Sequence, residues 1–321
     1  MPVIQSKYFA PVVFRNAHIA TIYAATLRRV KDPCSQRERL ELNDGDFIDL
    51  DWAYAPQPSE NVIIAMHGLS GNARRPYMLG MAKIFTEAGW DFAGINFRSC
   101  SGPINRLFRS YNAGATEDLE EVITNILSKN RYKRIALVGF SLGGNLLLKY
   151  LGENKNIPNE IKSAIAISTP CNLAASLEVL QTQENRFYTK RFEKQLKAQL
   201  LERQLVFPDQ LSRQEILSCN SLLAIDELYT SKAHGYFSAA DYYEKCSCLQ
   251  FLSEIKVPTL LLNAANDTFL SEDSYPRQTA HDSEALYLEV PLYGGHVGFI
   301  QHKRNYYQEE RALAFTRYFS G

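Results

Sequence analysis

Residues 134–152 read RIALVGFSLGGNLLLKYLG, and this stretch decides the fold class. An apolar run ends at Phe140, a Gly-x-Ser-x-Gly pentad centres on Ser141, and a second apolar run with helical character follows. When a strand precedes such a pentad and a helix follows it, the pentad predicts a nucleophile elbow, because small residues allow the sharp turn. The alternative interpretation is a serine that only caps a helix, and the residues further along the chain disfavour it.

Short apolar runs alternate with longer amphipathic runs along most of the chain. The sequence predicts a partly exposed strand at 46–55, followed by buried strands at 61–68, 91–97, 134–140, 163–168, 258–264 and 285–292. Helices are predicted at 76–89, 116–130, 142–154 and 305–319. Buried strands that alternate with helices indicate an α/β fold with a doubly wound, mostly parallel sheet.

The alternation stops between about residues 170 and 255. Residues 176–204 are charged and favour a helix, and residues 236–248 are rich in tyrosine. Because the sheet pattern resumes afterwards, we expect one domain over 1–321 with a helical cap insertion at about 170–255. The alternative is that the insertion is only structural and has no role at the site. Tyr242 and Tyr243 are candidates for lining an acyl pocket, and core or surface positions would explain them equally well.

Two side chains downstream of Ser141 complete a candidate catalytic site. A serine hydroxyl is a weak nucleophile and needs a general base within hydrogen-bond reach. Asp267 and His296 each follow a predicted buried strand, and parallel strands end at one edge of a sheet, so both are expected beside Ser141. His296 would accept and return the proton, while Asp267 would hold the imidazole tautomer. Asp273 is the alternative to Asp267 as the carboxylate that holds the imidazole.

Further candidates lie in the loops after the first two buried strands. An oxyanion hole needs two backbone N–H donors, and we expect these from Leu69 and from Leu142, the residue after the serine. Arg98 follows the strand at 91–97 and is a candidate substrate contact, although a role in organising its own loop is favoured. Cys100 is expected to be a packing residue, since no histidine is assigned to it.

The composition excludes several classes of function. Lys+Arg and Asp+Glu both number 35, so nothing favours nucleic acid or an anionic membrane surface. The six cysteines form no C-x-x-C pair, and no ligand spacing indicates a metal, so neither a metal nor another cofactor is expected. The first 20 residues lack a charged region followed by a long apolar core, so no signal peptide is expected, and no apolar run approaches about 20 residues. We therefore expect a cytoplasmic protein, with peripheral membrane contact left open.

Seven motifs together resemble the α/β-hydrolases, and more narrowly their YheT-like branch, also called hydrolase fold family 4. These motifs are FRNAHIATIYA, MHGLSGN, NFRSCSG with RSYNAGATEDL, VGFSLGGN, GYFSAADYY, NAANDTFL and GGHVGF. The resemblance covers nearly the whole chain, and its first and third motifs lie outside the candidate triad. The chain departs from the family pattern at Arg98-Ser99-Cys100, at Tyr111-Asn112-Ala113-Gly114 and at Thr268.

The resemblance implies a triad of Ser141, Asp267 and His296 and substrates that are acyl esters. Relatives include esterases, lipases acting on glycerolipids, and acyltransferases that make ethyl esters. The leading hypothesis is a carboxylic ester hydrolase for short- to medium-chain acyl esters or acylglycerols. Two alternatives stay open: an acyltransferase that passes the acyl group to an alcohol, and a non-catalytic binding module on the hydrolase scaffold.

Overall fold

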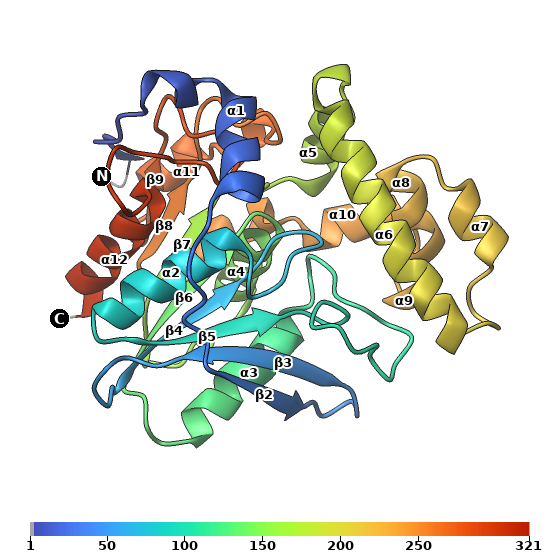
Figure 1. Cartoon of the computed structure of the whole chain (residues 1–321), viewed down its shortest axis with the longest axis horizontal. Helices are drawn as coiled ribbons and strands as arrows, with labels where there is room; N and C mark the ends of the chain where they lie inside the picture. The colour runs from blue at the N-terminus through green and yellow to red at the C-terminus, as the bar shows by residue number, and fades with distance from the viewer. Residues whose placement is uncertain (1–2, 321) are drawn as a thin grey trace.

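A nine-stranded sheet runs through the centre of the computed structural model, which describes residues 3–320 (Figure 1). The strands lie in the order β1-β9-β8-β7-β6-β4-β5-β3-β2. Only β3 pairs antiparallel with its neighbours, β2 and β5, and all other neighbouring strands pair parallel. The predicted doubly wound, mostly parallel sheet is therefore confirmed. The strands are β1 (Val3–Ile4), β2 (Gln36–Glu41), β3 (Phe47–Ala53), β4 (Asn61–Met66), β5 (Asp91–Asn96), β6 (Arg134–Phe140), β7 (Ile161–Ile167), β8 (Thr259–Leu262) and β9 (Leu286–Glu289).

Helices cover both faces of this sheet. Helices α3 (Thr116–Ser128) and α4 (Leu142–Glu153) pack on one face, and α2 (Pro76–Glu87) and α12 (Tyr307–Ser320) pack on the other. The side chains of β4 alternate between the two faces, because successive residues of a strand point in opposite directions. Val62, Ile64 and Met66 join the α3–α4 core, whereas Ile63 and Ala65 join the α2–α12 core.

The prediction of a partly exposed strand at 46–55 is wrong in its burial. Every residue of β3 is buried, including Asp49 and Asp51. The sequence pattern did not predict β2, which covers the outer edge of β3 and places Arg39 opposite Asp49 and Arg37 opposite Asp51. Each guanidinium donates two hydrogen bonds of 2.7–2.9 Å to its carboxylate. These pairs compensate the charge of the two aspartates, so alternating polar residues do not mark an exposed face here.

A run of helices separates β7 from β8. Helices α6 to α9 stand to one side of the sheet in Figure 1, and they share a small apolar core of their own around Leu200, Ile216 and Tyr229. Helix α10 returns to the body by packing on α5, and η5 packs on α4. The elements are α5 (Leu173–Leu180), η3 (Gln183–Asn185), α6 (Arg186–Val206), α7 (Arg213–Ser218), α8 (Leu222–Ile225), η4 (Asp226–Thr230), α9 (Ser231–Ala233), α10 (Ala239–Cys246) and η5 (Cys248–Glu254).

The remaining helical elements lie at the two ends of the chain. The N-terminal ones precede β2, and α1 lies above the sheet, beside the first turns of the inserted helices (Figure 1). The others lie between the strands β8 and β9 in the chain. They are η1 (Val12–Arg15), α1 (Ala17–Ile22), η2 (Tyr23–Leu27), η6 (Glu272–Ser274) and α11 (Arg277–Asp282).

Candidate active site

Ser141 occupies the single residue between strand β6 and helix α4. Its backbone angles are φ 53° and ψ −119°, a conformation that costs free energy for any residue with a Cβ atom. Such strain persists only where the surroundings hold the backbone in place, and it concentrates at functional sites. The elbow geometry expected from the pentad is therefore present at this serine.

Close backbone packing holds the elbow. A Cβ atom added to Gly143 would lie 2.6 Å from the carbonyl oxygen of His67, and one added to Gly144 would lie 2.0 Å from Thr169 Oγ1. Both distances are far below van der Waals contact, so a larger residue would push α4 away from the loop after β4 or from the loop after β7. The glycines after Ser141 thus bring the helix N-terminus against the neighbouring strand ends.

His296 lies between Ser141 and Asp267. Its Nε2 is 3.0 Å from Ser141 Oγ, and its Nδ1 is 2.9 Å from Asp267 Oδ2. The other carboxylate oxygen of Asp267 accepts a 3.0 Å hydrogen bond from the Phe269 N–H. A proton on Nδ1 that is donated to the carboxylate leaves the Nε2 lone pair facing the serine hydroxyl. Asp273 lies elsewhere and accepts a hydrogen bond from Asn172.

Three elements position the loop that carries His296. The backbone N–H of His296 donates to Thr21 Oγ1 on α1 at 2.9 Å, and the N–H of Val297 donates to Ser168 Oγ at 2.9 Å. The Phe269 ring stacks on the imidazole at 4.3 Å between centroids. Sequence reasoning missed Thr21, although it lies within the FRNAHIATIYA motif, because no local pattern connects it to a loop 275 residues away.

The backbone N–H groups of Leu69 and Leu142 are candidate donors beside Ser141. The N–H groups of the residues on either side of Leu69 are occupied, since Gly68 donates to the Tyr77 hydroxyl at 3.1 Å and Ser70 donates to the Tyr111 hydroxyl at 2.9 Å. Neither Leu69 nor Leu142 donates its N–H to any residue within 3–320. Both leucines line the same cavity as Ser141. The arrangement can offer two donors to an oxygen that binds there.

His67 braces the loop that carries Leu69. Its Nδ1 lies 2.8 Å from the Gly68 carbonyl oxygen, and its Nε2 accepts the Phe97 N–H at 3.2 Å. This pair of partners selects the neutral tautomer with the proton on Nδ1. Complete burial lowers the pKa of His67 to about 4, so the ring stays neutral near pH 7. Burial likewise raises the pKa of the Cys100 thiol to about 12, which keeps it protonated.

Two cavities meet at Ser141 and His296. The first, of about 180 Å³, extends under the inserted helices, and leucines of α5 and α6 line much of it. The second, of about 170 Å³, extends under α1 and η2 towards the start of α6. Leu69, Phe192 and Phe269 line both. A bound molecule with two arms can therefore place its central bond at the serine.

The two candidate tyrosines of the insertion line the first cavity. The Tyr242 hydroxyl accepts the Ala113 N–H at 3.0 Å, and the Tyr243 hydroxyl donates to Asp226 Oδ2 at 2.6 Å. Burial is the main cause that raises the pKa of the Asp226 carboxyl. Because both hydroxyls have partners in the protein, the tyrosines contribute mainly ring surface to the cavity.

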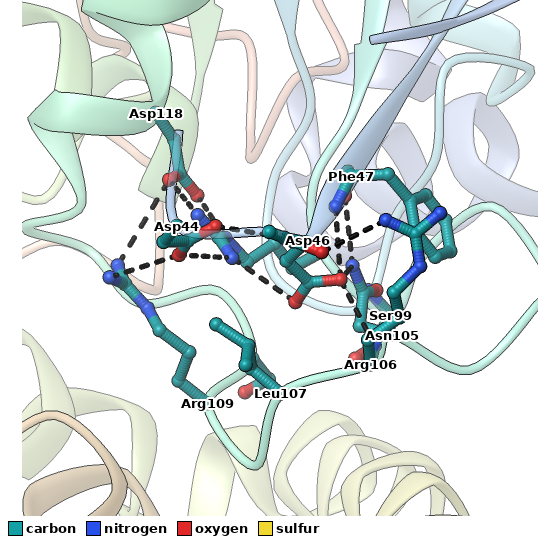
Figure 2. A network of polar contacts seen from close by, with 12 residues as sticks. Asp44, Asp46, Phe47, Ser99, Asn105, Arg106, Leu107, Arg109 and Asp118 are labelled. Carbon is teal, nitrogen blue, oxygen red and sulfur yellow. Dashed lines mark hydrogen bonds and ion pairs between the residues drawn. The ribbon is translucent and has the colours of Figure 1, made fainter. Parts of the chain in front are cut away.

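Arg98 is not brought to either cavity. Its side chain is 1 % exposed and binds three carboxylates, with 2.6 Å to Asp118, 2.8 Å to Asp44 and 3.1 Å to Asp46. Figure 2 shows the three aspartates gathered in this network, with Asn105 beside Asp46. A guanidinium that is almost fully buried and bound to three carboxylates is not available to a substrate in either cavity. Its contacts organise the loop after β5 and hold it to the loop before β3.

Sequence reasoning missed Arg203 of α6, which joins the inserted helices to the body. Its side chain donates to the Phe108 carbonyl at 2.7 Å and to Ser99 Oγ at 2.8 Å, and it also donates to the carbonyls of Leu107 and Arg109. Arg203 is 3 % exposed. In the sequence it is one of many basic residues in a charged helix, so no local signal distinguishes it.

Among residues 3–320, no group of three or more His, Cys, Asp or Glu side chains is arranged to hold a metal ion. Over the same residues, no helix combines the length and the apolar character needed to span a bilayer.

Comparison with known proteins places the chain in a family. The family model for the alpha/beta hydrolase fold matches residues 61–303. A protein of Escherichia coli (strain K12) named "Putative esterase YheT" is 32% identical over 89% of this chain and 85% of its own length. The chain therefore belongs to the α/β-hydrolases, and within them it is YheT-like, as its motifs predicted.

More distant relatives share most of the chain as well. The mouse protein "Phospholipase ABHD3" is 27% identical over 94% of this chain and 75% of its own length. The human protein "Monoacylglycerol lipase ABHD2" is 26% identical over 94% of this chain and 76% of its own length. Among solved structures, the esterase Pf2001 of Pyrococcus furiosus is similar in fold, with a TM-score of 0.60 at 16% identity over 92% of this chain and 96% of its own.

Proposed function

We propose that the protein hydrolyses carboxylic esters through an acyl-enzyme on Ser141. The observation that carries the proposal is the continuous hydrogen-bonded chain from Ser141 Oγ through the His296 imidazole to the Asp267 carboxylate. The names of the relatives, which include an esterase and two lipid hydrolases, support the same reaction class.

The proposed first half-reaction forms the acyl-enzyme. Ser141 Oγ attacks the ester carbonyl carbon while its proton passes to His296 Nε2, and the N–H groups of Leu69 and Leu142 bind the resulting oxyanion. Asp267 stabilises the imidazolium that forms. When the tetrahedral intermediate collapses, the carbon–oxygen bond to the alcohol breaks and His296 returns the proton to the departing alcohol oxygen.

The second half-reaction releases the acid. A water molecule gives a proton to His296 Nε2 as its oxygen attacks the acyl carbon, and the same two N–H groups bind the oxyanion again. The bond to Ser141 Oγ then breaks and the serine regains its proton from His296. No step needs a cofactor.

The inserted helices supply the proposed acyl site. Leucines and aromatic side chains line the first cavity: Leu142, Leu173, Leu177, Leu180, Leu196, Leu200, Tyr242 and Tyr243. Apolar lining of this kind favours a hydrocarbon chain, so we propose acyl esters of short to medium length or acylglycerols as substrates. In this proposal the segment at about 170–255 is a cap over the site.

A fluorophosphonate probe tests the proposed nucleophile. We expect the probe to label the wild-type protein at Ser141 and to leave Ser141→Ala unlabelled, and we expect Ser141→Ala to lose at least about 10³-fold in ester turnover. Circular dichroism should show that the variant remains folded. A wild-type protein that neither reacts with the probe nor cleaves any ester of a series of increasing acyl length would overturn the proposal and leave a binding module.

Acyl transfer to an alcohol is the second candidate, and the second cavity favours it. This cavity reaches Ser141 and His296 independently of the first, so it can hold an acceptor alcohol while the acyl group occupies the other. Product analysis with added ethanol or glycerol separates the two reactions. Accumulation of the new ester at the expense of free acid would favour transfer.

A further inference from the structure

The N-terminal helical segment exposes an apolar stripe. Helix α1 and η2 run continuously from Ala17 to Leu27, and the side that packs on the body carries Ala20, Thr21 and Ala24. The opposite side carries four large apolar residues at spacings of three and four, which place them on one face of a helix. They are Ile19, Ile22, Tyr23 and Leu27, with exposed fractions between 37% and 61%. We call these four residues the N-terminal apolar stripe.

Large exposed apolar residues are concentrated in this part of the chain. Of the 18 exposed large hydrophobic residues found within 3–320, eight lie between Val3 and Leu27. Val12 and Val13 of η1 are among them, and the ring of Phe14, also in η1, packs on Tyr23 of the stripe at 5.0 Å between centroids. Singly scattered exposed apolar residues are ordinary, whereas a contiguous group marks a binding surface.

The stripe adjoins the second cavity. Ile22 and Thr26 line that cavity, together with Phe187 at the start of α6, which is 65% exposed. Ser141 and His296 line the same cavity. His18 connects the two sides of this region, since its ring nitrogens lie 3.1 Å from the Tyr188 hydroxyl and 3.1 Å from Glu184 Oε1 on the inserted segment. An apolar surface is therefore continuous with a passage to the reactive serine.

The N-terminal segment that carries the stripe has a net positive charge, although the whole chain is neutral. Residues 1–31 contain five Lys or Arg residues and no Asp or Glu. Arg28 is paired with the buried Glu309, but the exposed Lys7, Arg29 and Lys31 form no ion pair within 3–320. The second cavity continues this pattern, because two arginines and no carboxylate line it: Arg75 and Arg191.

We propose that the N-terminal apolar stripe binds the surface of lipid assemblies that carry anionic headgroups. Apolar side chains on an exposed helix enter the boundary between headgroups and acyl chains, and neighbouring cations are attracted to the negative surface. Substrate then reaches Ser141 from that surface through the second cavity, a step that rests on the proposed function. The surface explains why the FRNAHIATIYA segment combines a buried side that fixes the His296 loop with an exposed side that is apolar.

Vesicle sedimentation tests the surface without using activity. We expect the full chain to bind vesicles of phosphatidylcholine with phosphatidylglycerol, and to bind vesicles of phosphatidylcholine alone more weakly. Ile19→Glu with Leu27→Glu should lower the partition coefficient by about tenfold or more, because two charges replace apolar area. The matched control is Leu205→Glu with Leu217→Glu, which places the same charges on exposed leucines of α6 and α7 and should bind like the wild type.

Several outcomes would overturn the proposal. Wild-type protein that binds neither vesicle overturns it, and so does equal binding by the stripe variant and the control variant. A concentration-dependent dimer in light scattering, lost in the stripe variant and unaccompanied by vesicle binding, would show that a second copy of the chain covers the stripe. Circular dichroism and probe labelling of Ser141 should be unchanged in both double variants, so a folding defect is recognised.

The passage of substrate from the lipid surface to Ser141 is tested by a separate measurement. The stripe variant should hydrolyse acylglycerol presented in anionic vesicles about tenfold more slowly, and a water-soluble short-chain ester at the wild-type rate. If the stripe variant hydrolysed the acylglycerol in vesicles at the wild-type rate, substrate delivery through the surface would be overturned. Ser141→Ala should bind vesicles as the wild type does, so that a failure of the proposed ester chemistry leaves the binding result intact.

Discussion

The edge of the sheet and the inserted helices build the two sides of the same site by different means. At the sheet edge, Ser141, Asp267 and His296 follow strands held by continuous backbone pairing and glycine contacts. The inserted helices contact the body largely through side chains, and one such contact is the loop where Arg203 and Tyr229 both donate to the Phe108 carbonyl. Backbone ladders set the positions of reacting groups closely, whereas side-chain contacts leave the shape of the cavity open to change by single substitutions.

The largest effect is expected at the sheet edge. Asp267→Asn keeps the size of the side chain but no longer favours the imidazole tautomer that faces Ser141, so kcat should fall by about 10³- to 10⁴-fold. Asp273→Asn is the matched control, because Asp273 is exposed and its side chain binds only Asn172 among residues 3–320. The turnover of this variant should stay within about twofold of wild type. Similar losses in the two variants would contradict the assignment of Asp267.

The second-largest effect is expected where Arg203 holds the inserted helices to the body, and it should appear in the free energy of unfolding. Arg203→Met leaves the carbonyls of Leu107 and Arg109 without this donor in a buried site, while Tyr229 still donates to the third carbonyl. The free energy of unfolding in urea should therefore fall by about 3 kcal/mol. Hydrogen exchange should quicken first in residues 173–246. Arg213→Met is the control on the same group of helices, since this arginine is exposed, and its change should stay below about 0.5 kcal/mol. Equal losses of stability in the Arg203→Met and Arg213→Met variants would mean that Arg203 does not hold the inserted helices to the body.

Acid should weaken the sheet edge through His67. The folded protein holds this ring neutral down to a pKa of about 4, whereas the unfolded chain protonates it near 6.5. The unfolded state therefore binds more protons between these values, and the free energy of unfolding should fall by about 2 kcal/mol between pH 7 and pH 5 through this group.

His67→Gln separates this contribution from that of other groups. Glutamine can donate to a carbonyl and accept an N–H but does not titrate, so the variant should lose about 2 kcal/mol less than wild type over the same pH interval. Urea unfolding at both pH values measures the difference. Parallel pH dependences would contradict a buried neutral His67.

The smallest effect is expected from a substitution in the inserted helices, and it should change only which acyl esters are hydrolysed. Leu196→Trp adds volume to the wall of the first cavity, so turnover of the longest accepted acyl ester should fall about tenfold, while an acetyl ester keeps its rate. Lys194→Trp on the exposed side of α6 is the control. A uniform loss across all chain lengths would show that this wall does not select the acyl group.

Local patterns predicted the elements that position Ser141, but not the contacts between distant segments. Apolar runs of six or seven residues mark buried parallel strands, and the Gly-rich turn after 134–140 marks the elbow. The burial of β3 escaped prediction because it depends on Arg37 and Arg39 across the ladder. Arg98 was assigned to the right loop, yet the carboxylates that surround it come from two other segments.

The sequence by itself determined which segments form the buried strands β4 to β9. It also determined the elbow, and it placed Asp267 and His296 after two of those strands. Parallel strands end at one edge, so chain order alone brings these positions near one another. Only the tertiary structure decided that Thr21 holds the His296 loop, that Arg203 fastens the inserted helices, and that two cavities meet at the serine. These features join residues far apart in the chain, and hydrophobic periodicity carries no information about such partners.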